Sequence, residues 1–566
     1  MKKIKKTIAV LLSFVMALSL FGVCASAEEG GLKISVASDV HTSVVEKISD
    51  FYGDGTLANR GTLLSLRDES FAVLDSFLRD SAEAGAKYVF LAGDNTDSGT
   101  TAQHEKITAI LKDYETRTGV EVFVVPGNHD YFAMGEEGVA YFREAYKDFG
   151  YGEAYASDDK TASYAVDLAD GYTLIAVDSV LPGDSTDGIT NALLSWIEAQ
   201  AKAATERGRK LICMMHHPII PQFSLQEKFM SDSVVRDWRK VSESLASFGI
   251  QYVFTGHKHS ADIAQNISTS GNVIYDVGVP SLVIYPLAYR FVTFSDEKVA
   301  IREMNVTSIR TPELLPSGYS TETLDKVINN TQEYSEEVFD ASFRRFVESS
   351  ILNPTALCRR LNIEDEKTKE AFKSVCTKAK TLIDYPLYGE GETIETIAAG
   401  YNIALPASDY ETAFDVLNVV FKAYCNGDEN LSVSSTEIQL GLKCFAILAD
   451  YSLEDYPDDI RILFLNALAA CFTGDTPAVT ASITAVVLGL GDGDFGVGVA
   501  SALIKPFLEE ILVDEAPADR NVDLPACTTD VVSNKVVGAL SFFEKVAAFF
   551  LKIWNFICGI FTAFSK

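Results

Sequence analysis

Short apolar runs alternate with amphipathic segments through the first 300 residues of this 566-residue chain. Runs such as Tyr88–Ala92, Val122–Val125 and Tyr252–Thr255 are short and rich in β-branched and aromatic side chains, which is typical of buried strands. Between these runs, segments such as Glu69–Glu83 and Ala192–Thr205 carry apolar residues at helical spacing. Strands separated by helices predict an α/β fold for this part of the chain.

The pattern changes after residue 305. Residues 306–320 are rich in proline, serine and glycine, and this composition predicts a linker. Residues 321–530 carry apolar side chains mostly at helical spacing, as at Val338, Phe339 and Phe343, which predicts a mainly α-helical accessory domain. Histidine is absent from this region, so we expect no second metal centre in it.

The amino terminus has the features of a signal peptide. Four lysines precede the apolar run Ile8–Val23, and Ala25–Ala27 supplies the small residues that signal peptidase cleaves. We therefore expect residues 1–27 to be removed near Ala27 and the protein to be exported, either secreted or associated with the cell surface. An uncleaved membrane anchor is the alternative. Cleavage removes four lysines and no acidic residue, and so takes the net charge from −31 to −35.

The carboxyl-terminal segment 531–566 is rich in Phe, Ile and Leu. From Val536 onward its small and polar residues form one narrow stripe on a helix. The longest uncharged run, Ile553–Ser565, is shorter than the roughly 20 residues that span a bilayer. We therefore expect an amphipathic helix over 536–566 that associates with a membrane surface. A helix that packs on the protein and a spanning helix with snorkelling lysines are the alternatives.

Charge and cysteine content narrow the class of protein. The chain is 47% hydrophobic and 22% charged, with 79 acidic and 48 basic side chains. Nucleic-acid polymers are not expected as partners, because phosphate backbones require clustered lysine and arginine. Eight cysteines follow the signal peptide and none forms a Cys-x-x-Cys pair. For the six cysteines from Cys358 to Cys527, disulfides and buried free thiols remain equal alternatives.

The seven histidines are unevenly distributed, and none follows residue 259. Six of them lie in short polar motifs, and each motif follows an apolar run. Four motifs contain these six histidines: Asp39-Val40-His41, Gly127-Asn128-His129-Asp130, His216-His217 and Gly256-His257-Lys258-His259. A fifth motif of the same kind, Gly93-Asp94-Asn95-Thr96-Asp97, is acidic and has no histidine. Ligands collect outside the carboxyl ends of strands in α/β sheets, so these loops can converge on one site. Carboxylates, an amide and imidazoles together suit divalent transition metals, and their number suits two ions.

The ordered set of five motifs resembles the calcineurin-like metallophosphoesterases, and is most similar to their cyclic-nucleotide and glycerophosphodiester phosphodiesterase branch. The resemblance covers about residues 30–305, and we assign the catalytic domain to 28–305. It implies a four-layer α/β/β/α sandwich, here followed by the helical domain. It also implies two divalent transition-metal ions, such as Mn, Fe, Zn or Co.

The resemblance assigns roles to individual residues. The implied metal ligands are Asp39, His41, Asp94, Asn128, His216, His257 and His259, with Asp94 bridging the two ions. His129 would face the substrate phosphate or the leaving oxygen, and Asp97 would pair with and orient that histidine. The implied reaction is attack of metal-activated hydroxide on phosphorus.

Three further residues are substrate candidates, each with a structural alternative. Arg60 could bind a phosphate oxygen or be an ordinary surface arginine. His217 could line the pocket or serve the fold, and Tyr285 could contact substrate or pack in the core. His104, in a polar helix start, is expected to be solvated.

Together these features predict an exported binuclear-metal phosphoesterase that hydrolyses a small phosphate ester. The family resemblance favours a phosphodiester. A phosphomonoesterase or nucleotidase acting at the same site is one alternative. The alternative from another class is a surface-binding or scaffolding protein with a vestigial metal site. The presence of every expected ligand type argues against that last reading.

Overall fold

The computed structural model describes residues 31–48, 64–181, 188–222, 226, 233–360, 363–427, 431–432, 434–454, 456–457, 461–462, 464, 498–500, 504–505 and 517–530. Three predicted features lie outside these residues: the signal peptide 1–27, Arg60 and the carboxyl-terminal segment 531–566.

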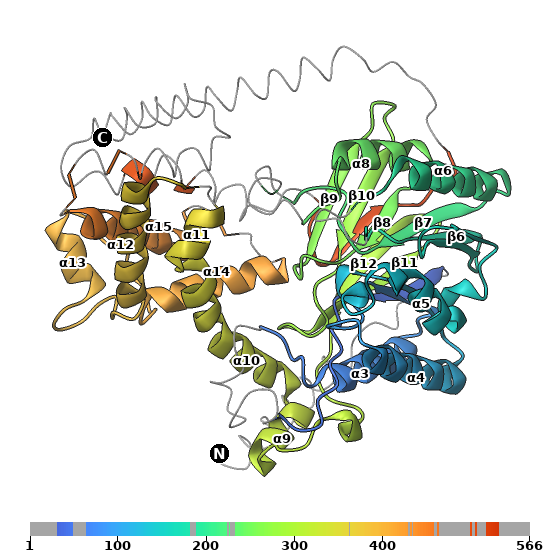
Figure 1. Cartoon of the computed structure of the whole chain (residues 1–566), viewed down its shortest axis with the longest axis horizontal. Helices are drawn as coiled ribbons and strands as arrows, with labels where there is room; N and C mark the ends of the chain where they lie inside the picture. Colours follow the sequence, from blue (N-terminus) through green and yellow to red (C-terminus); the bar gives the residue numbers. More distant parts are fainter. Residues whose placement is uncertain are drawn as a thin grey trace, which may run out of the picture.

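Two β-sheets form the centre of the catalytic domain (Figure 1). Their strands are β1 Leu32–Ala37, β2 Tyr88–Ala92, β3 Glu121–Val125, β4 Ala156–Ser157, β5 Tyr164–Asp167, β6 Tyr172–Val177, β7 Lys210–Met215, β8 Tyr252–Thr255, β9 Asp262–Ile267, β10 Val273–Gly278, β11 Ala288–Phe294, β12 Lys298–Asn305 and β13 Val522–Pro525. The first sheet has the order β13-β12-β11-β1-β2-β3, and the second has the order β4-β5-β6-β7-β8-β10-β9. Strands β1, β2 and β3 are parallel to one another, and so are β6, β7 and β8.

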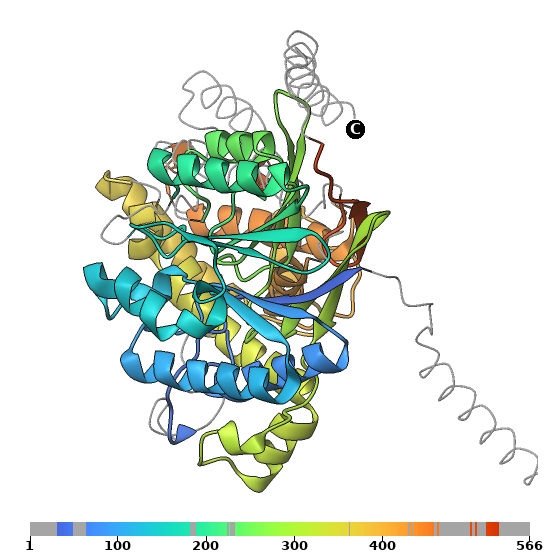
Figure 2. The ribbon, with the colours of Figure 1, turned by 90° about the vertical axis from the view of Figure 1, so that its right-hand side faces the viewer.

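Helices cover the outer face of each sheet (Figure 2). These helices are α3 Ser70–Glu83, α4 Thr101–Thr118, α5 Gly138–Ala145, α6 Asn191–Glu206 and α8 Trp238–Ser247. Helices α3 to α5 lie on the first sheet, and α6 and α8 lie on the second (Figure 1). The predicted four-layer α/β/β/α sandwich is therefore confirmed.

Alternation of side chains along each strand builds two different cores. In β2, Phe90 faces the second sheet and packs in the cluster that contains Phe254. Its neighbours Val89 and Leu91 point the other way and pack in the cluster that contains Phe77 of α3. A strand buried on both faces has an almost continuous apolar sequence, which explains the runs seen in the sequence.

The carboxyl-terminal region is mainly helical, as predicted. Its helices are α9 Thr321–Asn329, α10 Thr331–Phe346, α11 Pro354–Arg360, α12 Glu366–Leu382, α13 Ile394–Gly400, α14 Ala413–Asn426 and α15 Thr436–Leu453. Helices α12 to α15 share one apolar core, and α10 connects this bundle to the catalytic domain (Figure 1). Among the described helices, none combines the length and the apolar character required to cross a bilayer.

The domain boundaries differ from those expected. Within the predicted linker, Val306 and Ile309 are buried against α3, and Val327 and Tyr334 of α9 and α10 join the same core. Strand β13, placed by the sequence in the helical domain, pairs with β12 and so belongs to the catalytic sheet. A four-residue strand that ends in proline carries too little periodicity to be recognised in a sequence.

All six cysteines within the described part of the chain are free thiols. Five of them are buried and Cys444 is partly buried, which agrees with the buried-thiol alternative for those from Cys358 to Cys527. They are Cys213, Cys358, Cys376, Cys425, Cys444 and Cys527. Cys471 and Cys558 lie outside the described residues.

Candidate metal centre

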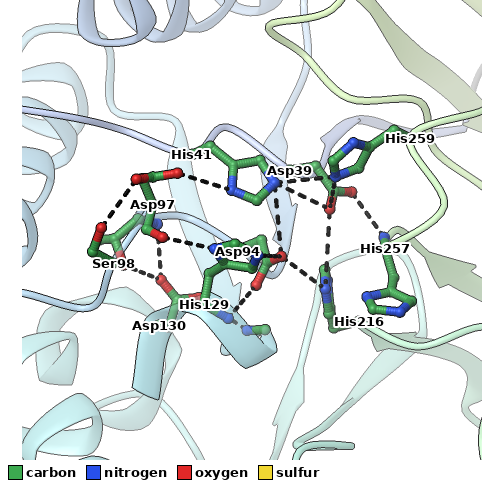
Figure 3. A network of polar contacts seen from close by, with 12 residues as sticks. Asp39, His41, Asp94, Asp97, Ser98, His129, Asp130, His216, His257 and His259 are labelled. Atoms are coloured by element: carbon green, nitrogen blue, oxygen red, sulfur yellow. Dashed lines mark hydrogen bonds and ion pairs between the residues drawn. The ribbon is translucent and has the colours of Figure 1, made fainter. Parts of the chain in front are cut away.

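The five polar motifs meet at the carboxyl ends of five strands (Figure 3). Each motif lies in the loop that directly follows its strand. Because parallel strands end at the same edge of a sheet, these loops lie close together. The ligand candidates are Asp39 and His41 after β1, Asp94 after β2, Asn128 after β3, His216 after β7, and His257 and His259 after β8. Residues more than 200 positions apart in the chain thus share one site.

The imidazole and carboxylate atoms point toward common centres. The Nε2 atoms of His41 and His259 lie 3.1 Å apart, and His259 Nε2 lies 3.2 Å from Asp39 Oδ1. Asp94 Oδ2 lies 3.3 Å from His216 Nε2 and 3.7 Å from His41 Nε2 (Figure 3). Asp94 therefore lies between one group formed with Asp39, His41 and His259 and a second group that includes His216.

Buried polar atoms without hydrogen bonds show that this set fits metal ions. Asn128 Oδ1 and Asp39 Oδ1 are both buried, and neither accepts a hydrogen bond from a described residue, although His259 Nε2 lies 3.2 Å from Asp39 Oδ1. Burying such an oxygen without a partner costs about 1–3 kcal/mol or more. A divalent cation would satisfy both oxygens, and a mixed set of carboxylate, amide and imidazole donors suits a transition metal.

The backbone of the site is strained where the ligands lie. Among the residues that the structure describes, nine non-glycine residues have positive φ, and five of these are predicted ligands. They are Asp39 (φ 53°), His41 (44°), Asp94 (50°), His257 (68°) and His259 (60°). Left-handed conformations are costly for residues with a Cβ atom and concentrate at functional sites. Hydrogen bonds stabilise these left-handed conformations. The backbone N–H of His41 donates to the Asp94 carbonyl oxygen, and the backbone N–H of His257 donates to Asp39 Oδ2.

Gly256, just before His257, permits a close approach between two of these loops. A Cβ atom there would collide with Ser38 Oγ and would lie 2.5 Å from Asp39 Oδ2. We expect Gly256→Ala to displace Asp39 and to reduce metal affinity at least about tenfold. The measurement is metal binding by calorimetry.

Gly441→Ala in α15 is the matched control, because a Cβ atom there meets nothing within 4 Å. Equal metal affinity in Gly256→Ala and the wild type would contradict the proposed crowding.

Burial and neighbouring charges set the protonation of the ligands. Burial alone would raise the pKa of Asp39 and Asp94, but nearby imidazoles outweigh it and hold both values below their usual range. Burial lowers the pKa of His41 to about 3 and also depresses the pKa of His257. Burial would also lower the pKa of His216, but the carboxylates of Asp94 and Asp39 outweigh it and raise that pKa to about 10. Ionised carboxylates and neutral imidazoles are the forms that bind metal ions, so a bound ion would have to displace the proton of His216.

His129 is oriented by the main chain. Its Nδ1 lies 2.6 Å from the carbonyl oxygen of Asp97, and its backbone N–H donates to Asp94 Oδ1 at 2.8 Å. A carbonyl only accepts, so Nδ1 must carry the hydrogen, and Nε2 is the atom available to a substrate.

The carboxylate of Asp97 has a different role from the predicted one. Instead of pairing with His129, it forms an ion pair with Arg67 and accepts a hydrogen bond from Ser98 Oγ at 3.0 Å. It also lies 3.9 Å from His41 Nδ1. The guanidinium of Arg67 neutralises the carboxylate, which leaves the carbonyl of the same residue to orient the imidazole. Arg67 belongs to none of the five motifs, and the sequence offered no signal for it.

Asp130 ties two of the ligand loops together. Its buried carboxylate accepts hydrogen bonds from the backbone N–H groups of Asn95, Thr96 and Gly127. It also accepts from the Asn95 amide and the Thr96 hydroxyl. Asp130 therefore fixes the loop after β3 against the loop after β2, a role that its place in the third motif left unassigned.

The prediction that His104 is solvated was wrong. The side chain is fully buried, with Nδ1 3.0 Å from Tyr146 Oη and Nε2 3.1 Å from the carbonyl oxygen of Asp130. The polar neighbours of His104 in the sequence concealed that this turn of α4 faces the core.

The remaining substrate candidates lie in two different places. His217 is buried beside the centre, with Nδ1 2.9 Å from Ser179 Oγ and its ring 4.4 Å from that of His257. Tyr285 packs toward the helical region, where Lys422 Nζ lies 5.5 Å from its ring centroid. A substrate role for either residue stays a prediction.

Asp276 supports the loop that follows His216 and His217. Its buried carboxylate accepts hydrogen bonds from the backbone N–H groups of Ile219 and Ile220, and burial raises its pKa to about 6. The unfolded chain should titrate near the ordinary value of 3.8. Between these values the native state binds more protons than the unfolded state, so this carboxyl reduces stability as pH rises.

Comparing wild type with Asp276→Asn isolates this titration. We expect the difference in unfolding free energy between the two proteins to change by about 2 kcal/mol between pH 4 and pH 7. Urea denaturation at both pH values measures it, and Asp159→Asn, at an exposed position, should show no such change. Parallel pH profiles for wild type and Asp276→Asn would contradict the assignment.

Comparison with known proteins agrees with this geometry. Residues 32–261 match the model of the calcineurin-like phosphoesterase family. This part of the chain is a calcineurin-like phosphoesterase domain. The matched segment begins with β1 and ends just after His259, so it spans all five ligand loops.

Three curated proteins are similar to the calcineurin-like phosphoesterase domain. A probable cyclic nucleotide phosphodiesterase of Rhodococcus erythropolis is 24% identical over 214 residues, which cover 37% of this chain and 64% of that protein. A cAMP/cGMP dual specificity phosphodiesterase of Mycobacterium tuberculosis is 25% identical, covering 30% of this chain and 48% of that protein. A glycerophosphodiester phosphodiesterase of Enterobacter lignolyticus is 26% identical, covering 31% and 57%. The chain thus spans between about half and two thirds of the length of these relatives.

Among solved structures, a dimetal phosphatase from Danio rerio aligns with a TM-score of 0.37 at 14% identity, over 49% of this chain and 96% of that chain. A purple acid phosphatase from Lupinus luteus aligns with a TM-score of 0.33 at 12% identity, over 50% of this chain and 53% of that chain.

Proposed function

We propose that this protein is an exported, metal-dependent phosphoesterase that hydrolyses a small phosphodiester. The observation that carries the proposal is the convergence of carboxylate and imidazole side chains around Asp94, whose Oδ2 lies 3.3 Å from His216 Nε2 and 3.7 Å from His41 Nε2. The buried Asn128 Oδ1 supports metal binding in particular, because this neutral oxygen has no hydrogen-bond partner among the described residues.

The protein's own side chains would divide the work. The ligand groups would hold two divalent ions, which supply Lewis acidity that activates water and neutralises charge on the phosphate. The Asp97 carbonyl holds the His129 imidazole with Nε2 directed into the site, 3.9 Å from Asp94 Oδ2. As the imidazolium, with a second proton on Nε2, His129 can deliver that proton to the leaving oxygen and return to the neutral Nδ1–H form, which is general-acid catalysis.

A small diester is preferred over other substrates for two reasons. The three similar curated proteins are all named phosphodiesterases. A net charge of −31 for the whole chain would repel a polyanion, whereas a single phosphate can be drawn in by the metal ions locally.

Export is supported by the sequence of residues 1–27, and association of 536–566 with a membrane surface is supported by its amphipathic stripe. Export would place the acidic surface of the protein outside the cell. Fractionation of cells that produce the full chain, followed by amino-terminal sequencing, tests cleavage near Ala27.

The test of function is turnover of bis-p-nitrophenyl phosphate and p-nitrophenyl phosphate by the metal-loaded protein. We expect the diester to be hydrolysed with the higher kcat/KM. Preference for the monoester would favour a phosphomonoesterase or nucleotidase. Turnover of neither ester by protein with two bound metal ions would favour a scaffolding protein with a vestigial site.

A further inference from the structure

An exposed phenylalanine lies against the predicted general acid. Phe132 is 61% exposed, and its ring centroid lies 4.4 Å from that of His129, at an interplanar angle of 42°. Single exposed apolar side chains are common on protein surfaces, so the exposure of Phe132 alone indicates nothing. The informative feature is its position, because the exposed ring lies against the imidazole of His129.

The backbone presents Phe132 rigidly. The residue follows the short 3-10 helix Asn128–Tyr131, and its N–H donates to the carbonyl oxygen of His129 at 3.3 Å. Tyr131, next to it, is buried and donates from Oη to Asp178 Oδ2 at 2.9 Å. Gly138 packs so closely that a Cβ atom there would lie 2.7 Å from the Tyr131 ring. One neighbour is thus locked into the core while Phe132 faces outward, which suits a binding surface.

The position of Phe132 is suited to contact with the leaving group of a bound ester. If His129 Nε2 protonates the leaving oxygen, the group attached to that oxygen lies beyond His129 on the solvent side. The exposed ring of Phe132 can contact that group, because it lies against His129. Stacking on an aromatic side chain is a common way to bind bases and aryl groups, and it does not require specific hydrogen bonds.

We propose that Phe132 is a specificity-determining residue that stacks on an aromatic or heteroaromatic leaving group. This inference rests on the proposed function, because it requires an ester bound at the metal centre. It adds the substrate class: phosphodiesters with a planar leaving group are favoured over those with a small aliphatic one. Orientation of His129 alone would predict something different, namely that loss of Phe132 affects every ester equally.

Binding of two phosphonates to metal-loaded protein separates these roles without relying on turnover. Phenylphosphonate carries a ring and methylphosphonate does not, while their phosphonate groups are alike. Stacking typically contributes about 1–3 kcal/mol, so we expect Phe132→Ala to weaken phenylphosphonate binding about 5–150-fold in calorimetry. Methylphosphonate should bind the variant within about twofold of the wild type, and Phe132→Tyr should retain phenylphosphonate binding.

Ile267→Ala is the matched control, because Ile267 is equally exposed at 61% but lies at the end of β9. It should leave both affinities unchanged. The proposal is overturned if Phe132→Ala weakens both phosphonates equally, or neither. Because binding and turnover are measured separately, selective phenylphosphonate binding by a protein that hydrolyses no ester would refute the proposed function and leave the stacking surface intact.

Discussion

Asp94→Ala is expected to remove at least one metal ion per chain and to lower kcat for a phosphodiester on the order of 10³-fold or more. The reason is the central position of this carboxylate. Oδ2 lies 3.3 Å from His216 Nε2 and 3.7 Å from His41 Nε2, while Oδ1 accepts from the backbone N–H of His129. Its loss would disconnect both ligand groups and release the loop that carries the general acid.

Asp170→Ala is the matched control for this experiment. Asp170 also has positive φ, 55° against 50° for Asp94, so the substitution carries the same backbone cost at an exposed turn between β5 and β6. It should leave metal content and kcat unchanged. Metal content by mass spectrometry and steady-state kinetics are the measurements. An Asp94→Ala protein with two bound ions and a rate within tenfold of wild type would contradict the assignment.

His129→Asn is expected to separate proton transfer from metal binding. Its imidazole contacts the Asp97 carbonyl through Nδ1, and Nε2 lies 3.9 Å from the nearest Asp94 oxygen, so both metal ions should remain bound. For a diester with a basic alkoxide leaving group, such as glycerophosphoethanolamine, kcat should fall about 10²–10⁴-fold.

The same variant should lose much less activity toward bis-p-nitrophenyl phosphate. The p-nitrophenolate group leaves readily without a proton, so a general acid contributes little to its departure. The decisive measurement is therefore the loss of kcat for each of the two esters in His129→Asn, with metal content measured in parallel. Equal losses on both esters, or a loss of metal, would place His129 among the ligands instead of at the leaving oxygen.

The sequence predicted that the ligand candidates lie at one site, because the signal is local. Each candidate lies in a short polar motif at the end of a recognisable strand, and parallel strands bring such ends to one edge of the sheets. The structure accordingly brings together the atoms of Asp39, His41, Asp94, His216 and His259. The alternation of strands and helices predicted the α/β class, and the resemblance to the metallophosphoesterases implied the four-layer architecture.

The supporting residues could not be predicted because their roles depend on contacts between distant loops. Arg67 pairs with Asp97 across 30 positions, and nothing near Arg67 in the sequence indicates an active site. The buried carboxylate of Asp130 resembles any acidic residue in a turn until its five donors are known. His104 and strand β13 show the same limit, since their burial and pairing come from the tertiary structure.

Titration of metal-free protein with a divalent transition metal, with turnover of bis-p-nitrophenyl phosphate followed at each addition, tests the central claim most directly. The account predicts that activity rises with bound metal and reaches its plateau at two ions per chain, with no such rise in Asp94→Ala. Two bound ions without turnover of either the diester or the monoester would contradict it.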